Sequence, residues 1–315
     1  MTDTTHTTHS ADVHDNAYTG LVEADADSRW AFGSGFDDPL AGLDVSVPPG
    51  VDGPALAAYS LMLGDDALVM AQRLTEWCTR APELEEEVAL ANVALDLLGQ
   101  TRLLYARAAA ADPESVPGLP AGSPVPDEDR LAFFRDEADY RCVWLVQIPD
   151  ADFAGVVVRL VAFATWRLAL LVALERSVDP VVAAVAAKGV KEVRYHRDYA
   201  ARWLLTLAGG TDESRRRVVD ALRATWPHLP ELRREDRTTA TLVASGAAAD
   251  PETVWAETSA VLRQVLDAAG LSEPEIRAAL PEGEPGGRDG HHTQWLPPLL
   301  EELQGLARAH PMGRW

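Results

Sequence analysis

Lysine is almost absent from this chain of 315 residues, because Lys188 and Lys191 are the only two among 28 basic side chains. Arginine supplies the rest, and 49 acidic residues outnumber them, which gives a formal net charge of −21. A protein this acidic repels the phosphates of nucleic acids and of anionic membranes. The composition therefore argues against nucleic acid and membrane as partners.

Cysteine is equally scarce, since Cys78 and Cys142 are the only two and they form no CxxC spacing. We expect two reduced thiols in a cytoplasmic protein rather than a disulfide framework. The N-terminus is not basic and then apolar, so no secretory signal is predicted. One apolar stretch, residues 156–174, contains Arg159 and Arg167, which favours a buried helix over a membrane span.

The signatures of several enzyme classes are missing too. The chain has no GxSxG, no GxxxxGK[ST], no GxGxxG after a strand and no HExxH, which argues against the hydrolases, nucleotide-binding proteins and zinc proteases that these motifs mark. Strand-like alternation is nearly absent, and apolar residues recur with helical spacing instead. We therefore predict an all-α fold.

Four long helices follow from that spacing, as two closely linked pairs separated by a proline-rich crossover. This order is typical of a ferritin-like four-helix bundle. Residues 1–50 hold nine acidic residues against one arginine and are predicted to be a disordered extension, whereas 51–315 are predicted to form one domain. The predicted core helices span 54–79, 83–111, 152–177 and 180–208. Additional helices are predicted at 127–146 in the crossover and, after the bundle, at 212–226, 251–269 and 295–310.

Apolar stripes on the first two helices are predicted to face the core, because their members alternate at spacings of four and three. The stripe of the first helix comprises Leu56, Ser60, Leu63, Ala67, Met70, Leu74 and Trp77. The stripe of the second comprises Leu84, Val88, Ala91, Leu95, Leu98 and Tyr105.

A polar seam interrupts these apolar helices at mid-length. Carboxylates and imidazoles that face one another inside a four-helix bundle are the ligands of a di-iron site. The seam residues are Asp65 and Asp66 on the first helix, Asn92, Asp96 and Gln100 on the second, and Lys188, Glu192 and His196 on the fourth.

The ligand set of such a site is incomplete in this chain. Two helices should each supply Glu-x-x-His, but Gly99 follows Asp96 where a histidine is needed, and His196 lies one residue too far from Glu192. The third helix offers Thr165 to Arg167 where a carboxylate is needed. The degenerate positions would be Asp65, Asp66, Asp96, Gln100, Glu192 and His196.

Two interpretations of the seam remain open on these residues. One is a catalytic di-iron centre with an atypical ligand set. The other is a metal-free polar network, because buried carboxylates without metal need another cation. Lys188 or Arg167 could supply that charge and join Asp66, Asp96 and Glu192.

Adjacent histidines, His291 and His292, follow a glycine-rich loop near the C-terminus. They could be ligands, but such a loop is more often a structural clamp or a partner contact. We favour the structural interpretation and assign the two histidines no catalytic role.

Longer motifs run from Pro54 to Trp315: LGDDAL at 63–68, QRLTEWC at 72–78, APELEEE at 81–87, ALANVALDLLGQ at 89–100, FRDE at 134–137, AKGVKEVRYH at 187–196 and GRDGHHT at 287–293. Together they resemble the C subunits of bacterial phenylacetyl-CoA 1,2-epoxidases. The resemblance implies a multicomponent complex that epoxidises the aromatic ring of phenylacetyl-CoA with O2 and reductant from NADPH.

In that family the di-iron centre belongs to the A subunit, and the C subunit is a ferritin-like relative that has lost its metal site. The resemblance thus implies a structural subunit of phenylacetate catabolism, with no catalytic residue and no cofactor of its own. It implies the A subunit as partner, together with further small subunits. The acidic net charge argues against direct binding of coenzyme A phosphates by this chain, although Arg215, Arg216 and Arg217 form a local basic cluster that could contact them.

Overall fold

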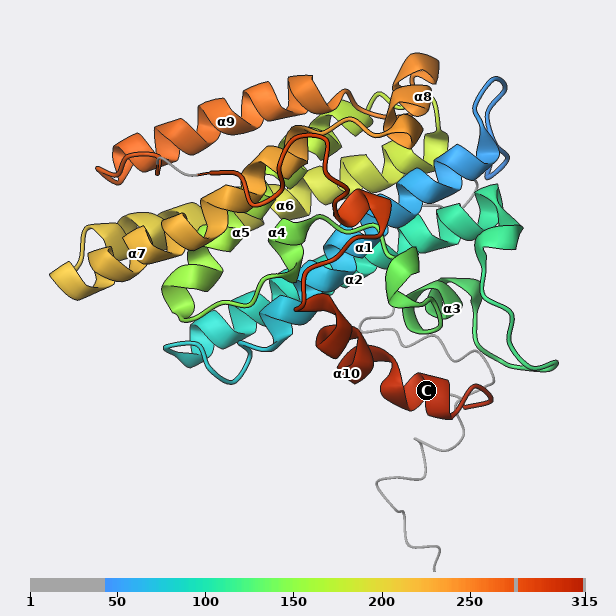
Figure 1. Cartoon of the computed structure of the whole chain (residues 1–315), viewed down its shortest axis with the longest axis horizontal. Coiled ribbons are helices and arrows are strands. Elements are labelled where there is room, and N and C mark those ends of the chain that lie inside the picture. Colours follow the sequence, from blue (N-terminus) through green and yellow to red (C-terminus); the bar gives the residue numbers. More distant parts are fainter. Residues whose placement is uncertain (1–42, 275–276, 314–315) are drawn as a thin grey trace, which may run out of the picture. The chain divides into compact units, whose positions relative to one another are not determined.

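The computed structural model describes residues 43–274 and 277–313. These residues belong to one compact unit, and they contain helices and loops but no strand (Figure 1). The all-α prediction is thus confirmed for this part of the chain. The predicted extension, 1–50, lies almost wholly outside the described residues.

The four predicted long helices are all present, as α1 (Gly53–Thr75), α2 (Leu84–Ala111), α5 (Phe153–Leu174) and α6 (Pro180–Ala208). Aspartate caps begin three of them. The side chains of Asp52, Asp152 and Asp179 accept hydrogen bonds from backbone N–H groups in the first turns of α1, α5 and α6, which satisfies donors that a helix start leaves free.

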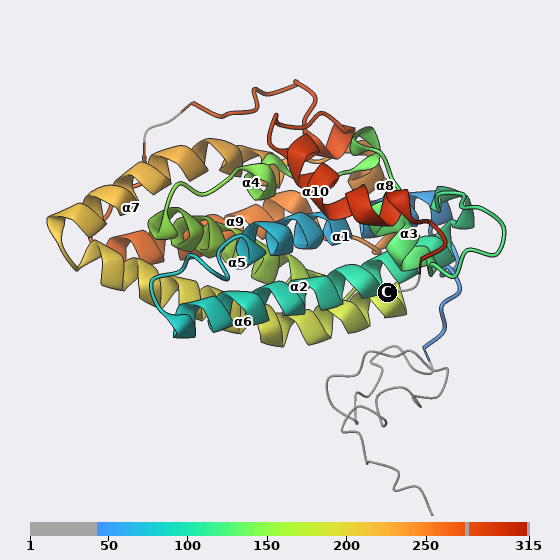
Figure 2. The ribbon, with the colours of Figure 1, turned by 90° about the horizontal axis from the view of Figure 1, so that it is seen from below.

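The long helices pack as α1 on α2 and α5 on α6, and α2 also contacts α6 (Figure 2). Among the described helices, α5 alone is long and apolar enough to cross a membrane, but 83% of its most apolar stretch is buried inside the protein. Its Arg159 is buried in an ion pair with Asp150. Helix α5 is therefore a core helix, and α6, α7 and α9 pack around it.

The prediction of one crossover helix at 127–146 is wrong. The segment instead contains two short helices, α3 (Asp127–Phe133) and α4 (Trp144–Gln147). Between them, the backbone N–H of Arg141 donates to Asp65 at 2.7 Å, and that of Val143 donates to Asp66 at 2.9 Å. Two buried carboxylates thus take N–H donors that a continuous helix would have used internally.

The helices after the four long ones are α7 (Asp212–Thr225), α9 (Pro251–Ala268) and α10 (Leu296–Ala309), close to the predicted ranges. Two further elements were not predicted, the 3-10 stretch η4 (Trp226–Arg233) and α8 (Arg237–Ser245). Helix α8 ends at Gly246, whose φ of 77° is the left-handed conformation that glycine adopts without strain. Helix α8 covers α1, whereas α7 and α9 cover α5.

The predicted core stripe is confirmed for α1, since every member from Leu56 to Trp77 is buried. It is wrong for much of α2, where Leu84, Val88 and Leu95 are 69%, 52% and 64% exposed. Helix α2 is apolar on two faces, and it buries the face that was not predicted. That face comprises Leu90, Val93, Ala94, Leu97, Leu104, Tyr105 and Ala108.

Candidate functional site

Asp65 lies fully buried in a cage of donors. Arg135 forms an ion pair with its Oδ1 at 2.5 Å, the hydroxyl of Tyr105 donates to the same oxygen at 2.5 Å, and the N–H of Arg141 donates to Oδ2. Burial, followed by the negative charge of Asp65, raises the pKa of Tyr105 well above its usual value. Tyr105 therefore stays a neutral donor, and the Asp65 carboxylate has no oxygen free for a metal ion.

Asp66 is likewise fully buried and bound by a different arginine. Arg288 contacts it through Nη2 at 2.7 Å and Nη1 at 3.2 Å, while the N–H of Val143 donates to Oδ1. Burial raises the pKa of Asp66, and the Arg288 guanidinium opposes that shift. The arginine of the GRDGHHT motif thus ties the C-terminal loop to the middle of α1.

The centre of the seam is a chain of hydrogen bonds from the surface to the core. Lys188 Nζ lies 2.8 Å from Glu192 Oε1, and Gln100 Nε2 donates to Glu192 Oε2 at 3.1 Å. Gln100 Oε1 accepts from Arg167 at 3.2 and 3.3 Å, and Arg167 also donates to the carbonyl oxygen of Leu63 at 3.0 Å. We call Lys188, Glu192, Gln100 and Arg167 the core network.

Arg167 is the innermost member of the core network and is 0% exposed. Its partners are an amide oxygen and a backbone carbonyl, which carry no charge. Burial lowers the pKa of Arg167 to about 10, with Asp66 opposing the shift, so the group remains a cation at neutral pH. A fixed positive charge therefore lies where the predicted seam crosses α5.

The remaining seam pair is separate from the core network. His196 Nε2 lies 2.9 Å from Asp96 Oδ2, which links α6 to α2, and the Asp96 side chain is 39% exposed. The structure therefore does not unite Lys188, Asp66, Asp96 and Glu192 as predicted. It joins Lys188 to Glu192 alone, because Asp66 is held by Arg288 and Asp96 by His196.

Gly99 and Gly189, which have no side chain, leave space for the core network. A Cβ added at Gly99 would lie 3.8 Å from Lys188 Nζ, and one at Gly189 would lie 3.2 Å from Gln100 Nε2 and 2.9 Å from Leu171 Cδ1. Among the described residues, the carboxylates that cluster closely enough to share a metal ion are those of Glu83, Glu85 and Glu86, at the start of α2 rather than in the seam.

His292 belongs to a clamp on the C-terminal loop. Gln147 Nε2 lies 3.0 Å from His292 Nδ1, and His292 Nε2 lies 3.1 Å from the carbonyl oxygen of Tyr140. The amide donor and carbonyl acceptor define a neutral imidazole protonated at Nε2, and burial lowers its pKa. His291 is exposed and contributes its carbonyl oxygen to the indole N–H of Trp144. The structural interpretation of this loop fits these contacts.

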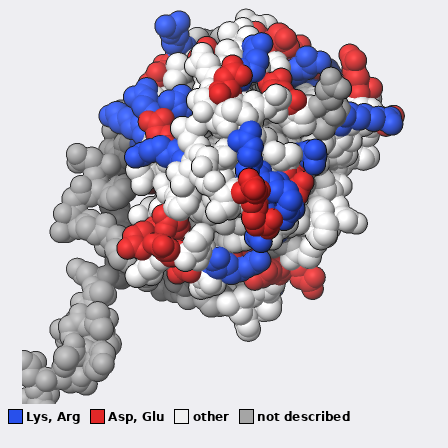
Figure 3. All heavy atoms as spheres, turned by 90° about the vertical axis from the view of Figure 1, so that its left-hand side faces the viewer, with Lys and Arg blue, Asp and Glu red and all other residues white. Residues whose placement is uncertain are grey.

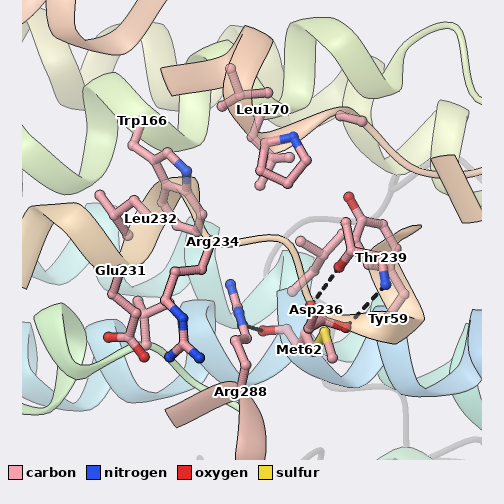
Figure 4. A pocket seen from close by; sticks show the side chains of 15 residues that line it. Tyr59, Met62, Trp166, Leu170, Glu231, Leu232, Arg234, Asp236, Thr239 and Arg288 are labelled. Carbon is pink, nitrogen blue, oxygen red and sulfur yellow. Dashed lines mark hydrogen bonds between the residues drawn. The ribbon is translucent and has the colours of Figure 1, made fainter. Parts of the chain in front are cut away.

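Glu231 joins three distant segments, and no sequence motif marked it. Its carboxylate accepts the N–H groups of Trp144 at 2.7 Å and of Gly287 at 2.9 Å. Burial raises the pKa of Glu231 to about 7, which these two donors and Arg288 oppose. The carboxylate borders a small pocket lined by Trp166, Arg234, Asp236 and Arg288 among others (Figure 4).

The arginine cluster on α7 is occupied by intramolecular contacts. Arg216 and Arg217 form ion pairs with Glu213 at 2.8 Å, and Arg216 also contacts Asp220 at 2.7 Å. Arg215 donates to carbonyl oxygens at the ends of α6 and α9. Figure 3 likewise shows acidic and basic side chains intermixed on the face it presents. The cluster therefore offers no concentrated positive charge for phosphates.

Comparison with known proteins gives two concordant matches. A family model described as phenylacetic acid catabolic protein matches residues 46–315. The C subunit of the 1,2-phenylacetyl-CoA epoxidase of Escherichia coli (strain K12) is 40% identical over 260 residues, which cover 82% of this chain and 99% of the relative. The family match includes the helices, the core network and the C-terminal clamp. The chain belongs to the phenylacetic acid catabolic protein family.

Proposed function

We propose that this chain is a structural, non-catalytic subunit of a cytoplasmic, multicomponent phenylacetyl-CoA 1,2-epoxidase. Its four long helices form a ferritin-like bundle that supports a di-iron catalytic A subunit in aerobic phenylacetate catabolism. The chain itself holds no cofactor, and further small subunits complete the complex. The E. coli relative, which is named as the C subunit of such an epoxidase, supports this assignment.

Arg167 is the observation that carries the non-catalytic part of the proposal. A di-iron site needs several carboxylates and two imidazoles around two cations. The core network offers one carboxylate, Glu192, between a lysine ammonium and a buried guanidinium. Metal cations placed there would meet like charge in a medium of low dielectric constant. The residues present therefore do not fit a di-iron centre.

Asp65 and Asp66 do not supply the missing ligands. Each would have to leave a buried arginine and a backbone N–H donor before it could bind a metal ion. Removing one partner from a buried ion pair costs about 3–5 kcal/mol. A catalytic di-iron oxygenase with an atypical ligand set is accordingly the less favoured function.

Metal analysis tests the proposal. The protein is purified alone and after coexpression with its A subunit, and iron is measured by mass spectrometry alongside phenylacetyl-CoA epoxidation. We expect no iron above background in the protein alone, and activity only when the A subunit is present. Iron at about two per chain, with oxo-bridge absorption and activity in the absence of the A subunit, would overturn the proposal.

A further inference from the structure

Helix α2 carries an exposed apolar strip that the bundle does not use. Leu84, Val88 and Leu95 are 69%, 52% and 64% exposed, and Ala91 lies between them on the same helix face. We call these four residues the α2 strip. A helix on a protein surface normally presents polar side chains outward, and adjacent exposed apolar residues mark interaction sites.

The spacing of the α2 strip indicates the shape of what covers it. Its members are separated by four, three and four residues, the alternation of a coiled-coil seam. Such a seam packs side chains into holes formed by a second helix. Because α2 buries a different face against the other described helices, no helix in the described part of the chain covers the α2 strip.

The charge beside the α2 strip indicates the chemistry of that helix. Carboxylate oxygens of Glu83, Glu85 and Glu86 all lie within 4.8 Å of one another at the strip's N-terminal end. In the described part of the chain, no lysine or arginine forms an ion pair with them. Arginine or lysine side chains on the partner would relieve this repulsion. A second copy of this chain, with a net charge of −21, would bring the same acidic cluster.

Helix α6 lies beside α2 (Figure 2) and also carries exposed apolar side chains. Tyr195 is 51% exposed and stacks on Tyr199 with ring centroids 6.4 Å apart, and Leu205 is 39% exposed. The contact between His196 and Asp96 at 2.9 Å places Tyr195, the neighbour of His196, beside the middle of α2. Aromatic residues at the border of an apolar strip are typical of interface cores.

We propose that the α2 strip binds an amphipathic helix of the catalytic A subunit, with arginine or lysine side chains next to Glu83, Glu85 and Glu86. This inference rests on the proposed function and adds the docking surface and its chemistry. The neighbouring Tyr195 and Leu205 on α6 widen the contact.

A pair of matched variants tests the surface. Leu95→Asp places a charge in the strip, and Leu306→Asp places one at a similarly exposed leucine on α10, where the exposed fraction is 60%. Binding of each full-length variant to the immobilised A subunit is measured by interferometry, after circular dichroism and thermal unfolding have confirmed the fold. We expect Leu95→Asp to weaken binding by more than about tenfold and Leu306→Asp to leave it unchanged.

A second variant, which changes only charged side chains beside the strip, tests the surface even if Leu95→Asp does not fold. Glu85→Lys with Glu86→Lys should weaken binding to the A subunit, and this effect should diminish as salt is raised. Wild-type affinity in both Leu95→Asp and the charge variant would overturn the docking surface and leave the proposed function standing. Failure of the wild-type protein to bind the A subunit would overturn the proposed function. A strip-dependent homodimer seen by sedimentation would assign the strip to a second copy and overturn the inference.

Discussion

The ammonium group of Lys188 lies directly beside Gly99, and a Cβ atom at that glycine would be only 3.8 Å from Nζ. Gly99 stands three residues after Asp96, where a di-iron helix carries its histidine. An imidazole at position 99 would compete with Lys188 for the same space. The space that a histidine of a di-iron ligand set would fill is thus taken in this chain by the ammonium group of Lys188.

Replacing Lys188 by methionine tests whether its charge supports the core network. The lysine side chain is 30% exposed and that of its partner Glu192 is 17% exposed, so the pair is more shielded than a surface ion pair. We expect Lys188→Met to lower the free energy of unfolding by about 1–2 kcal/mol, since Glu192 keeps only Gln100 as a donor. Urea titration measures the change. Lys191→Met, on the exposed side of α6, should change stability by less than about 0.5 kcal/mol. Equal effects of the two variants would show that Lys188 acts as an ordinary surface residue.

Gly64 lets α1 pack closely against the ring of Tyr105 on α2. A Cβ at Gly64 would lie 2.5 Å from Cε1 of Tyr105, a ring that is fixed because its hydroxyl contacts Asp65 and Arg135. Alanine favours a helix by about 1 kcal/mol over glycine, but overpacking here should outweigh that gain. We expect Gly64→Ala to lower the melting temperature by several degrees, for a net loss of about 1–2 kcal/mol.

The matched control for Gly64 is Gly305 in α10, where an added Cβ meets no atom within 4 Å. Gly305→Ala should raise the free energy of unfolding by up to about 1 kcal/mol through helix propensity alone. Differential scanning calorimetry of the two variants should therefore give shifts of opposite sign. A stabilising Gly64→Ala would show that Tyr105 can move away without losing its contacts.

The long helices could be predicted from the sequence because local signals determine them. Asp52, Asp152 and Asp179 start helices by capping, and the stripe of α1 faces a single core. The buried face of α2 was wrongly predicted because that helix is apolar on two faces. Periodicity alone does not indicate which of two apolar faces packs against the other helices.

The seam was predicted only in part for a related reason. Lys188 and Glu192 lie one helical turn apart, so sequence spacing brings them together. The partners of Asp65 and Asp66, Arg135 and Arg288, come from 70 and 222 residues away. No local pattern encodes contacts that the crossover and the C-terminal loop make only after folding. The contacts of Glu231 are not encoded locally either, since its donors belong to Trp144 and Gly287.

Replacement of Arg135 and of Arg167 by methionine should lower the free energy of unfolding by different amounts. Arg135→Met leaves the buried Asp65 carboxylate without its cation, and we expect a loss of about 3–5 kcal/mol. Arg167→Met removes a buried charge whose partners are uncharged, so relief of desolvation offsets the lost hydrogen bonds. Its cost should stay below about 2 kcal/mol. Chemical denaturation of both variants checks the order, and a larger loss for Arg167→Met would show that its charge is essential to the core network.

Glu231 should make stability depend on pH in the opposite sense to an ordinary ion-paired carboxylate. Burial raises its pKa from 4.5 to about 7 in the folded protein. Between these values the folded state keeps a proton that the unfolded state releases. The free energy of unfolding therefore falls as pH rises through this interval, by at most about 1.4 kcal/mol per pH unit from this group. Above pH 7 the contribution becomes constant.

Glu231→Gln removes that titration while retaining an oxygen that can accept one of the two N–H groups. The other titrating groups, such as His228, whose pKa burial lowers to about 4, act alike in both proteins and cancel in the comparison. We expect the stability difference between wild type and Glu231→Gln to change steadily from pH 4.5 to 7 in urea titrations, with wild type losing its relative advantage as pH rises. Parallel pH profiles would instead mean that Glu231 ionises at its ordinary pKa, with Arg288 and the two backbone donors outweighing its burial.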